Sequence, residues 1–229
     1  ARKILEKLDP DFGISNEEFP FLDYREGKVA GLSVRVFRVS FSGELSYEIN
    51  VGARDAQALW AAVFEAGADF DIMPYGVEAL DILRIEKGHL NIGTEIDGKT
   101  TPDDIGLGGM VKKDQFFMGS VLLDRPDHHR KDRLQLVGLA PVDAKSMIPR
   151  GSQILKTKFY GIMENSLGHV TATVYSPTLE QPIALALIKG GHSRFGEKFY
   201  ATSPVTSQEV QVIVTNPVFF DPSGDRLRA

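Results

Sequence analysis

Glu48 is the side chain whose surroundings most favour ligand chemistry. It lies in an alternating apolar segment that is typical of a strand, where β-propensity would favour Val or Thr over a carboxylate. The aromatic residues Phe41 and Tyr47 and the hydroxyls of Ser42 and Ser46 lie close to it in sequence. A carboxylate accepts two parallel hydrogen bonds, so a flat ligand edge with adjacent N–H donors, or an arginine guanidinium, would satisfy it. The alternative is an exposed position on an edge strand.

The histidines and glycine runs have simpler interpretations. His128 and His129 lack a third ligand at the spacing of zinc sites, and the other histidines are isolated from any serine or aspartate pattern: His89, His169 and His192. The glycine runs at 106–109 and 190–191 lack the features of a phosphate loop or a dinucleotide fingerprint. The sequence therefore predicts no metal site, no catalytic histidine and no nucleotide site in this chain.

Two groups of charged residues are interpreted as structural. Arg84, Glu86 and Lys87 lie on a predicted helix and are expected to form a solvated polar face. Asp103 and Asp104 follow a Thr-Pro pair and are expected to cap a short helix within a longer loop. Proline and carboxylates both suit a first helical turn.

The elements that must hold Glu48 begin with a hairpin. Alternating residues at 29–41 and 47–51 predict two antiparallel strands, whereas 9–25 has no clean period and is interpreted as a connection. A helix is predicted from Asp55, as N-cap, to Gly67, as C-terminal glycine, and a second one ends at Gly88. Strands followed by helices predict an α+β fold.

A polar run at 124–132 contains a proline and interrupts the periodic structure on both sides. We therefore place a domain boundary between residues 124 and 125. The region beyond it contains short β-rich runs bounded by Gly, Pro, Ser or Asn, which predict a small antiparallel barrel or sandwich.

The composition is that of a soluble globular protein. The chain has 229 residues and a formal charge of -5, which argues against a nucleic-acid partner. It has no cysteine, so disulfides are excluded and the cytoplasm is the expected compartment. No apolar run approaches the roughly 18 residues of a membrane span. Because the sequence opens within an amphipathic helix pattern without an initiator Met, we interpret it as part of a longer protein.

Three motifs follow one another along the chain. They are RVSFSGELSYEI at 38–49, GVEALDILRIEKG at 76–88 and GHVTATVYSPTL at 168–179. In this order they resemble the motifs of the folate-dependent aminomethyltransferase family, which contains the glycine-cleavage T-protein. The resemblance implies that residues 1–124 form the C-terminal part of a folate-binding domain. It also implies that residues 125–229 form an antiparallel β-barrel, and that tetrahydrofolate is the ligand.

The resemblance also implies roles for individual residues. Glu48 matches the family's pterin-recognising glutamate, and Phe41, Tyr47 and Ser42 are implied to line the same folate site. Phe41 stands where some relatives have a Tyr beside the pterin, and Leu80 stands where the T-protein has a folate-contacting Arg. The family's catalytic aspartate is expected upstream of this chain.

Segments 86–107 and 216–224 are similar to one branch of the family, the α subunits of heterotetrameric sarcosine oxidase. This similarity implies that sarcosine is oxidised at a flavin on another subunit and that the imine is captured here as 5,10-methylenetetrahydrofolate. FAD, FMN and NAD are implied for the full complex but not for this chain, which is expected to be inactive without its partner subunits. The alternatives are a non-catalytic scaffold module and an aminomethyltransferase.

Overall fold

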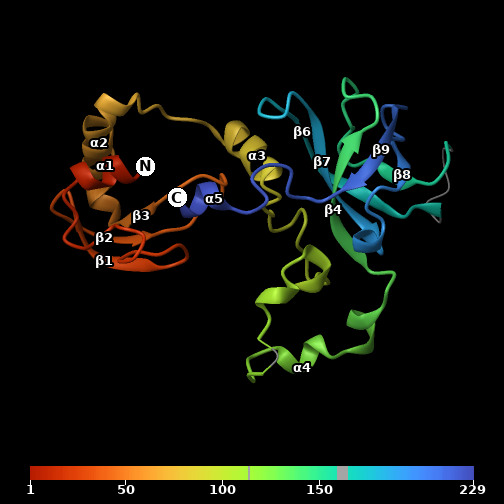
Figure 1. The fold of residues 1–229 in the computed structure, drawn as a ribbon, viewed down its shortest axis with the longest axis horizontal. Coiled ribbons are helices and arrows are strands. Elements are labelled where there is room, and N and C mark those ends of the chain that lie inside the picture. Colours follow the sequence, from red (N-terminus) through yellow and green to blue (C-terminus); the bar gives the residue numbers. More distant parts are fainter. Residues whose placement is uncertain (113, 159–164) are drawn as a thin grey trace. The chain divides into compact units, whose positions relative to one another are not determined.

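The structure is a computed structural model that describes residues 1–112, 114–158 and 165–229 (Figure 1). These residues form two compact units, one of residues 1–84 together with 221–229 and one of residues 85–220. The units are groups of residues in mutual contact. The domain limits predicted from the sequence, 1–124 and 125–229, stay a prediction.

An antiparallel sheet in the order β1-β2-β3 carries the first unit. Its strands are β1 (Tyr24–Val29), β2 (Leu32–Phe37) and β3 (Glu48–Val51). The predicted hairpin is confirmed, because β2 and β3 pair antiparallel. β1 begins in the segment interpreted as a connection. Its residues YREGKV show no apolar alternation, and it pairs with β2 through a turn at Ala30 and Gly31, both at positive φ.

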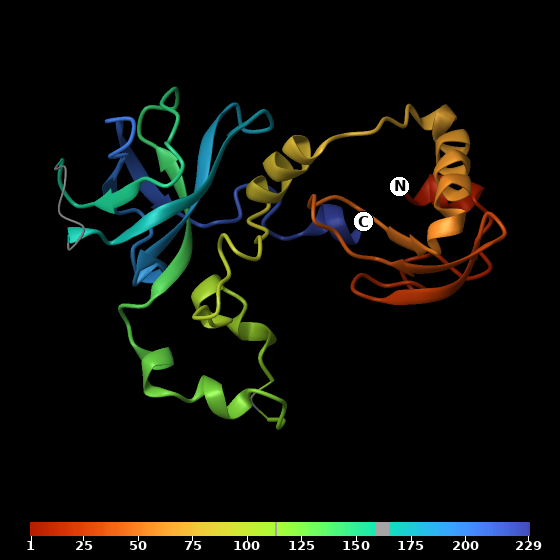
Figure 2. The same ribbon diagram turned by 180° about the vertical axis from the view of Figure 1, so that it is seen from behind.

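Two helices cover one face of this sheet (Figures 1 and 2). They are α1 (Arg2–Lys7) and α2 (Ala56–Gly67). Leu5 of α1 and Leu59 of α2 pack with Val34 and Val36 of β2 in one hydrophobic cluster. Because strand side chains alternate between faces, the other face carries the remaining side chains of each strand.

α2 spans the predicted helix but ends differently from the prediction. Asp55 makes no side-chain capping hydrogen bond, and Gly67 lies within the helix. A Cβ atom on Gly67 would lie 2.6 Å from the Cγ2 atom of Ile72. Glycine is therefore favoured by this close approach, and the residue in the left-handed conformation is Asp71, which follows the 3-10 turn after α2.

A closed barrel dominates the second unit (Figure 2). Around the barrel the strand order is β4-β7-β6-β5-β8-β9. The strands are β4 (Leu134–Pro141), β5 (Gln153–Leu155), β6 (Gly168–Ser176), β7 (Gln181–Lys189), β8 (Lys198–Thr202) and β9 (Glu209–Thr215). Buried aliphatic residues such as Val137, Ile154 and Val212 form its core. The α+β prediction is confirmed, and the sandwich alternative is wrong.

The remaining described helices are short, apart from α3 (Val77–Glu86), within which the division between the units falls. They are α4 (Ser120–Leu123), α5 (Asp225–Arg228) and the 3-10 turns Ala53–Asp55, Ala68–Phe70, Asp103–Ile105, Gly108–Met110, Pro126–His129 and Gly191–Ser193. Among the residues that the structure describes, no helix has the length and apolar character to cross a membrane.

Arg38, which follows β2, is buried and joins distant segments of the first unit. Its Nη1 atom donates to the carbonyl of Phe19 at 2.6 Å, and its Nη2 atom donates to the carbonyls of Arg228 and Ala229 at 3.0 and 3.1 Å. Burial lowers the pKa of the Arg38 guanidinium. Since the carbonyls of Arg228 and Ala229 lie at the end of α5, Arg38 anchors this helix to the sheet.

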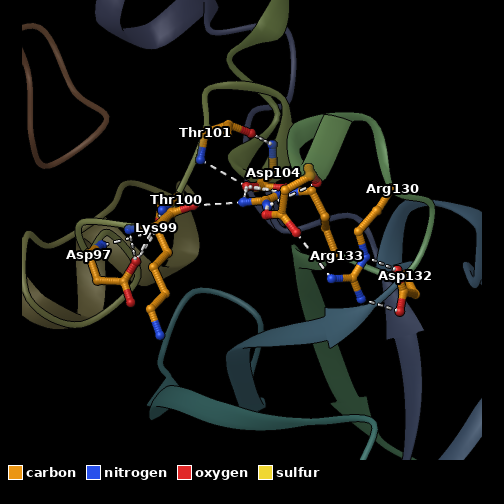
Figure 3. A network of polar contacts seen from close by, with 9 residues as sticks. Asp97, Lys99, Thr100, Thr101, Asp104, Arg130, Asp132 and Arg133 are labelled. Atoms are coloured by element: carbon orange, nitrogen blue, oxygen red, sulfur yellow. Dashed lines mark hydrogen bonds and ion pairs between the residues drawn. The ribbon is translucent and has the colours of Figure 1, made fainter. Parts of the chain in front are cut away.

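A second polar network lies in the other unit (Figure 3). The Asp104 carboxylate receives hydrogen bonds from the Arg133 Nε and Nη2 atoms at 2.9 and 2.6 Å and from the Thr101 backbone N–H at 2.8 Å. Burial acts to raise the pKa of Asp104, but the bonds from Arg133 and Thr101 outweigh it and hold the pKa below its usual range. Arg133 also donates to the carbonyl of Lys99, so the network joins the 99–104 loop to the start of β4. Asp104 is therefore an ion-pair partner, and the expected cap by Asp103 or Asp104 is not found, because the 3-10 turn Asp103–Ile105 has no side-chain capping hydrogen bond.

The first prediction concerns Asp104→Asn in the intact protein. We expect a loss of stability of about 2 to 4 kcal/mol at neutral pH. The Arg133 guanidinium, whose side chain is only 12% exposed, keeps its charge but loses its buried carboxylate partner, and the exposed Asp127 remains as its other one. Since the folded pKa of Asp104 is lowered, its contribution is present above the unfolded pKa of about 4 and is lost as pH falls through the folded pKa. Urea denaturation at several pH values should show the difference from wild type narrowing below about pH 4.

Asp132→Asn is the matched control. Asp132 pairs with Arg130 at 2.7 Å, but both side chains are more than half exposed. The expected loss is below about 1 kcal/mol. Equal losses for the two variants would contradict a structural role for the Asp104 pair.

The second prediction is that Arg38→Lys destabilises the first unit by about 2 to 4 kcal/mol. An ammonium group lacks the planar fork that reaches the Phe19 carbonyl and the α5 carbonyls together, so buried acceptors are left unpaired. Arg35→Lys, in β2, is the control, because Arg35 is 55% exposed and pairs with Glu26 at the surface. Denaturation midpoints should fall for the first variant and hardly move for the second. A similar shift in both would show that the burial of Arg38 does not matter.

Candidate functional site

The outer face of the β1-β2-β3 sheet carries Glu48. Tyr24, Phe37 and Glu48 lie opposite one another across the three strands, and Glu26, Arg35 and Asn50 form the next row. All these side chains are exposed or half-buried. Directly opposed residues share a face, so the first row places aromatic rings next to a carboxylate.

Glu48 itself is exposed at the start of the edge strand β3. Its Oε1 atom accepts a hydrogen bond from the Nδ2 atom of Asn50 at 3.2 Å. In the part of the chain that the structure describes, this is the one side-chain hydrogen bond found for the Glu48 carboxylate. A carboxylate has more lone pairs than this single bond uses, so it can accept from a ligand edge. The alternative of an edge-strand surface position fits the same burial.

The loop that precedes Glu48 uses its own hydroxyls. The Ser40 hydroxyl accepts from the backbone N–H of Gly43 at 3.0 Å, and the Ser42 hydroxyl accepts from the N–H of Glu44 at 3.4 Å. The Ser42 and Ser46 hydroxyls lie 3.5 Å apart. These bonds give Ser42 a role in shaping the turn, and its predicted contact with folate stays a prediction. Phe41 is 39% exposed, so its ring reaches the surface.

Tyr47 lies on the other side of the sheet from Glu48. It packs against the buried cluster of the first unit, with its ring centroid 5.8 Å from that of Phe19. Its hydroxyl accepts a hydrogen bond from the Nε atom of Arg2 at 3.3 Å. The structure therefore brings Glu48 close to Phe37, which the sequence did not single out, and separates it from Tyr47. Phe37 could have been identified only with the β2–β3 register, which the sequence does not give.

Glu44 was also missed in the sequence. It pairs with Arg226 of α5 at 2.7 Å, so two residues of the 38–49 motif, Arg38 and Glu44, hold the C-terminal helix. An arginine and a glutamate flanking a serine-rich turn gave no hint of a partner almost two hundred positions away. These contacts fix both ends of the turn that leads to Glu48.

The expectation of a solvated face at 84–87 is wrong. Arg84, Glu86 and Lys87 are all buried. Glu86 accepts hydrogen bonds from the hydroxyls of Ser176 at 2.5 Å and Thr178 at 3.1 Å, which fixes the helix end to the barrel. The period of a short helix does not show which of its polar faces another element will cover.

The other candidate groups add no second site. Among the described residues, no three His, Cys, Asp or Glu side chains gather closely enough to hold a metal ion. The second unit has a hollow of about 580 Å³ that is lined mainly by apolar residues, among them Ile96, Ile105, Leu107 and Phe117. A hollow of similar volume in the first unit is lined in part by Glu26, Arg35 and Asn50, which form the row next to the one that contains Glu48.

Comparisons with known proteins agree with this architecture. Residues 1–115 match the family model "GCVT N-terminal domain", and residues 135–221 match the "Glycine cleavage T-protein C-terminal barrel domain". A solved glycine cleavage system aminomethyltransferase T from Bartonella henselae superposes with a TM-score of 0.75 at 22% identity. The superposition covers 96% of this chain and 56% of the aminomethyltransferase chain. At 22% identity it supports only the assignment of the fold.

Curated relatives give the degree of similarity. The chain is 43% identical to the sarcosine oxidase subunit alpha of Rhizobium meliloti (strain 1021) over 99% of its own length and 23% of that protein's. It is 38% identical to the corresponding subunit of Corynebacterium sp. (strain P-1), and 28% identical to an aminomethyltransferase of Thermotoga petrophila. The chain spans about a quarter of the length of these sarcosine oxidase subunits. On both of its matched domains, the chain belongs to the glycine cleavage T-protein family.

Proposed function

We propose that this chain binds a reduced folate through Glu48 and forms the folate-binding region of a sarcosine oxidase α subunit. The observation that carries the proposal is the exposed Glu48 carboxylate, which lies beside Phe37 on the outer face of the sheet. A pterin edge presents paired N–H donors, which a carboxylate accepts with two parallel hydrogen bonds. Family membership and the 43% identity to a sarcosine oxidase subunit alpha support the choice.

The residues of the chain would bind and orient the ligand. Asn50 holds one Glu48 oxygen at 3.2 Å and limits the rotation of the carboxylate. Arg38 and Glu44 anchor the turn before β3 to α5, which fixes the position from which Glu48 projects. Bound tetrahydrofolate would supply the amines that accept the one-carbon unit of the sarcosine-derived imine, with release of glycine.

Oxidation of sarcosine would take place elsewhere in the complete enzyme. The glycine runs of this chain do not form a dinucleotide fingerprint. We therefore assign FAD, FMN and NAD, and the oxidation step, to other parts of the complex and to partner subunits. The chain alone would then be inactive towards sarcosine.

The third prediction tests Glu48 directly. In the intact protein, Glu48→Gln should lower the affinity for 5-formyltetrahydrofolate about 30- to 1000-fold, because an amide donor then faces a ligand donor while the shape hardly changes. Isothermal titration calorimetry measures the affinity. The melting temperature should hardly change, because the hydrogen bond of Glu48 to Asn50 lies at the surface.

Glu26→Gln is the matched control. Glu26 is a carboxylate on the same face and pairs with Arg35. Its substitution should leave folate affinity within about threefold of wild type, since a surface ion pair contributes little. No folate binding by the wild type would favour the scaffold alternative, and unchanged affinity in Glu48→Gln would remove Glu48 from the site. Glycine-dependent methylene transfer with a lipoyl-protein would favour an aminomethyltransferase instead.

A further inference from the structure

An aromatic pair stands next to Glu48 on the outer face of the sheet. Tyr24 of β1 lies opposite Phe37 of β2, and Phe37 lies opposite Glu48 of β3. The Tyr24 and Phe37 rings are stacked, with centroids 5.7 Å apart and planes 27° from parallel. Phe37 is therefore covered by Tyr24 on one side and borders Glu48 on the other.

This pair lies outside the core of the first unit. The buried cluster under α1 and α2 contains Val34 and Val36, which project from the opposite face of β2. Tyr24 is 52% exposed and Phe37 is half-buried. An aromatic surface that is open to a ligand, with a hydrogen-bond acceptor at its border, suits a flat ring with polar edges.

The next row does not offer such a surface. There Arg35 pairs with Glu26 at 2.7 Å, and Asn50 completes the row. An apolar ring face placed over these groups would desolvate an ion pair without replacing its hydration. The ring of the ligand is therefore expected to lie on the row formed by Tyr24, Phe37 and Glu48.

We propose that Phe37, with Tyr24 stacked behind it, is the stacking surface for the pterin ring whose N–H edge Glu48 accepts. This inference rests on the proposed function and extends it to the residues that contact the ring face. Stacking on an aromatic side chain tolerates ring substitution, whereas the carboxylate recognises the pattern of donors. Together the two contacts would select a planar heterocycle with adjacent N–H groups.

The fourth prediction uses two Phe37 variants of the intact protein. Phe37→Leu removes the aromatic face but keeps an apolar side chain, and should weaken binding of both 5-formyltetrahydrofolate and 6-methyltetrahydropterin about 5- to 50-fold. Phe37→Tyr keeps the ring and should retain the affinity within about threefold, as stacking depends on the π-face. Tyr24→Leu provides a second test at a more exposed position and should weaken binding of both ligands in the same direction.

Phe64→Leu is the control for loss of a half-buried aromatic ring. Phe64 pairs with Trp60 on α2, with centroids 4.7 Å apart, away from the outer sheet face. The affinity of the Phe64→Leu variant for folate should match that of the wild-type protein. Weakened binding in Phe37→Leu with a melting temperature close to that of wild type would support the proposal.

Two results would overturn the inference, and they are distinct. If Glu48→Gln loses affinity while Phe37→Leu and Tyr24→Leu bind as wild type does, the ring lies elsewhere and the proposed function stands. If Phe37→Leu and Phe37→Tyr lose affinity equally, the position matters for sheet structure rather than for stacking. Absence of folate binding by the wild type would overturn the proposed function together with this inference.

Discussion

The burial of the Arg38 guanidinium is the constraint on which the first unit depends. A buried charge is costly unless its donors are paired, and the two Nη atoms of Arg38 reach carbonyls on Phe19 and at the end of α5. Its buried Nε atom has no hydrogen-bond partner among the described residues. The same residue directly follows β2, where the turn to Glu48 begins. The pairing of one cation therefore decides where the C-terminal helix docks and how the turn before β3 is held. The backbone position of the exposed Glu48 is thus held by the hydrogen bonds of the buried Arg38.

Three carboxylates of this chain show how surroundings determine what a residue type does. Asp104 and Glu86 are buried and are paired with Arg133 or with the hydroxyls of Ser176 and Thr178, so their hydrogen-bonding capacity serves folding. Glu48 is exposed, and among the described residues its carboxylate accepts one side-chain hydrogen bond, from Asn50. A carboxylate whose lone pairs are used within the protein has little to offer a ligand. This contrast, and not the residue type, makes Glu48 the binding candidate.

Local pattern predicted much of the fold, and long-range contact explains what it missed. The β2–β3 hairpin, α2, α3 and the β-rich second half follow from apolar periods and turn residues. β1 carries Glu, Gly and Lys and gains its structure from pairing with β2. The burial of Glu86 and the roles of Arg38 and Glu44 depend on partners far along the chain. At the site, Glu48 was found from its unusual place in a strand, whereas Phe37 required the register.

The docking of α5 on the first unit has a consequence for synthesis of the protein. The first unit combines residues 1–84 with 221–229, and the second unit lies between them in the sequence. During translation the carbonyls of Arg228 and Ala229 are synthesised after the whole barrel. Until then the Arg38 guanidinium is hydrated or paired with other groups. The barrel strands are complete by Thr215 and are free to fold first. A chain released after residue 220 would therefore hold every barrel strand but an unfinished sheet unit, which is an opportunity for chaperones to bind.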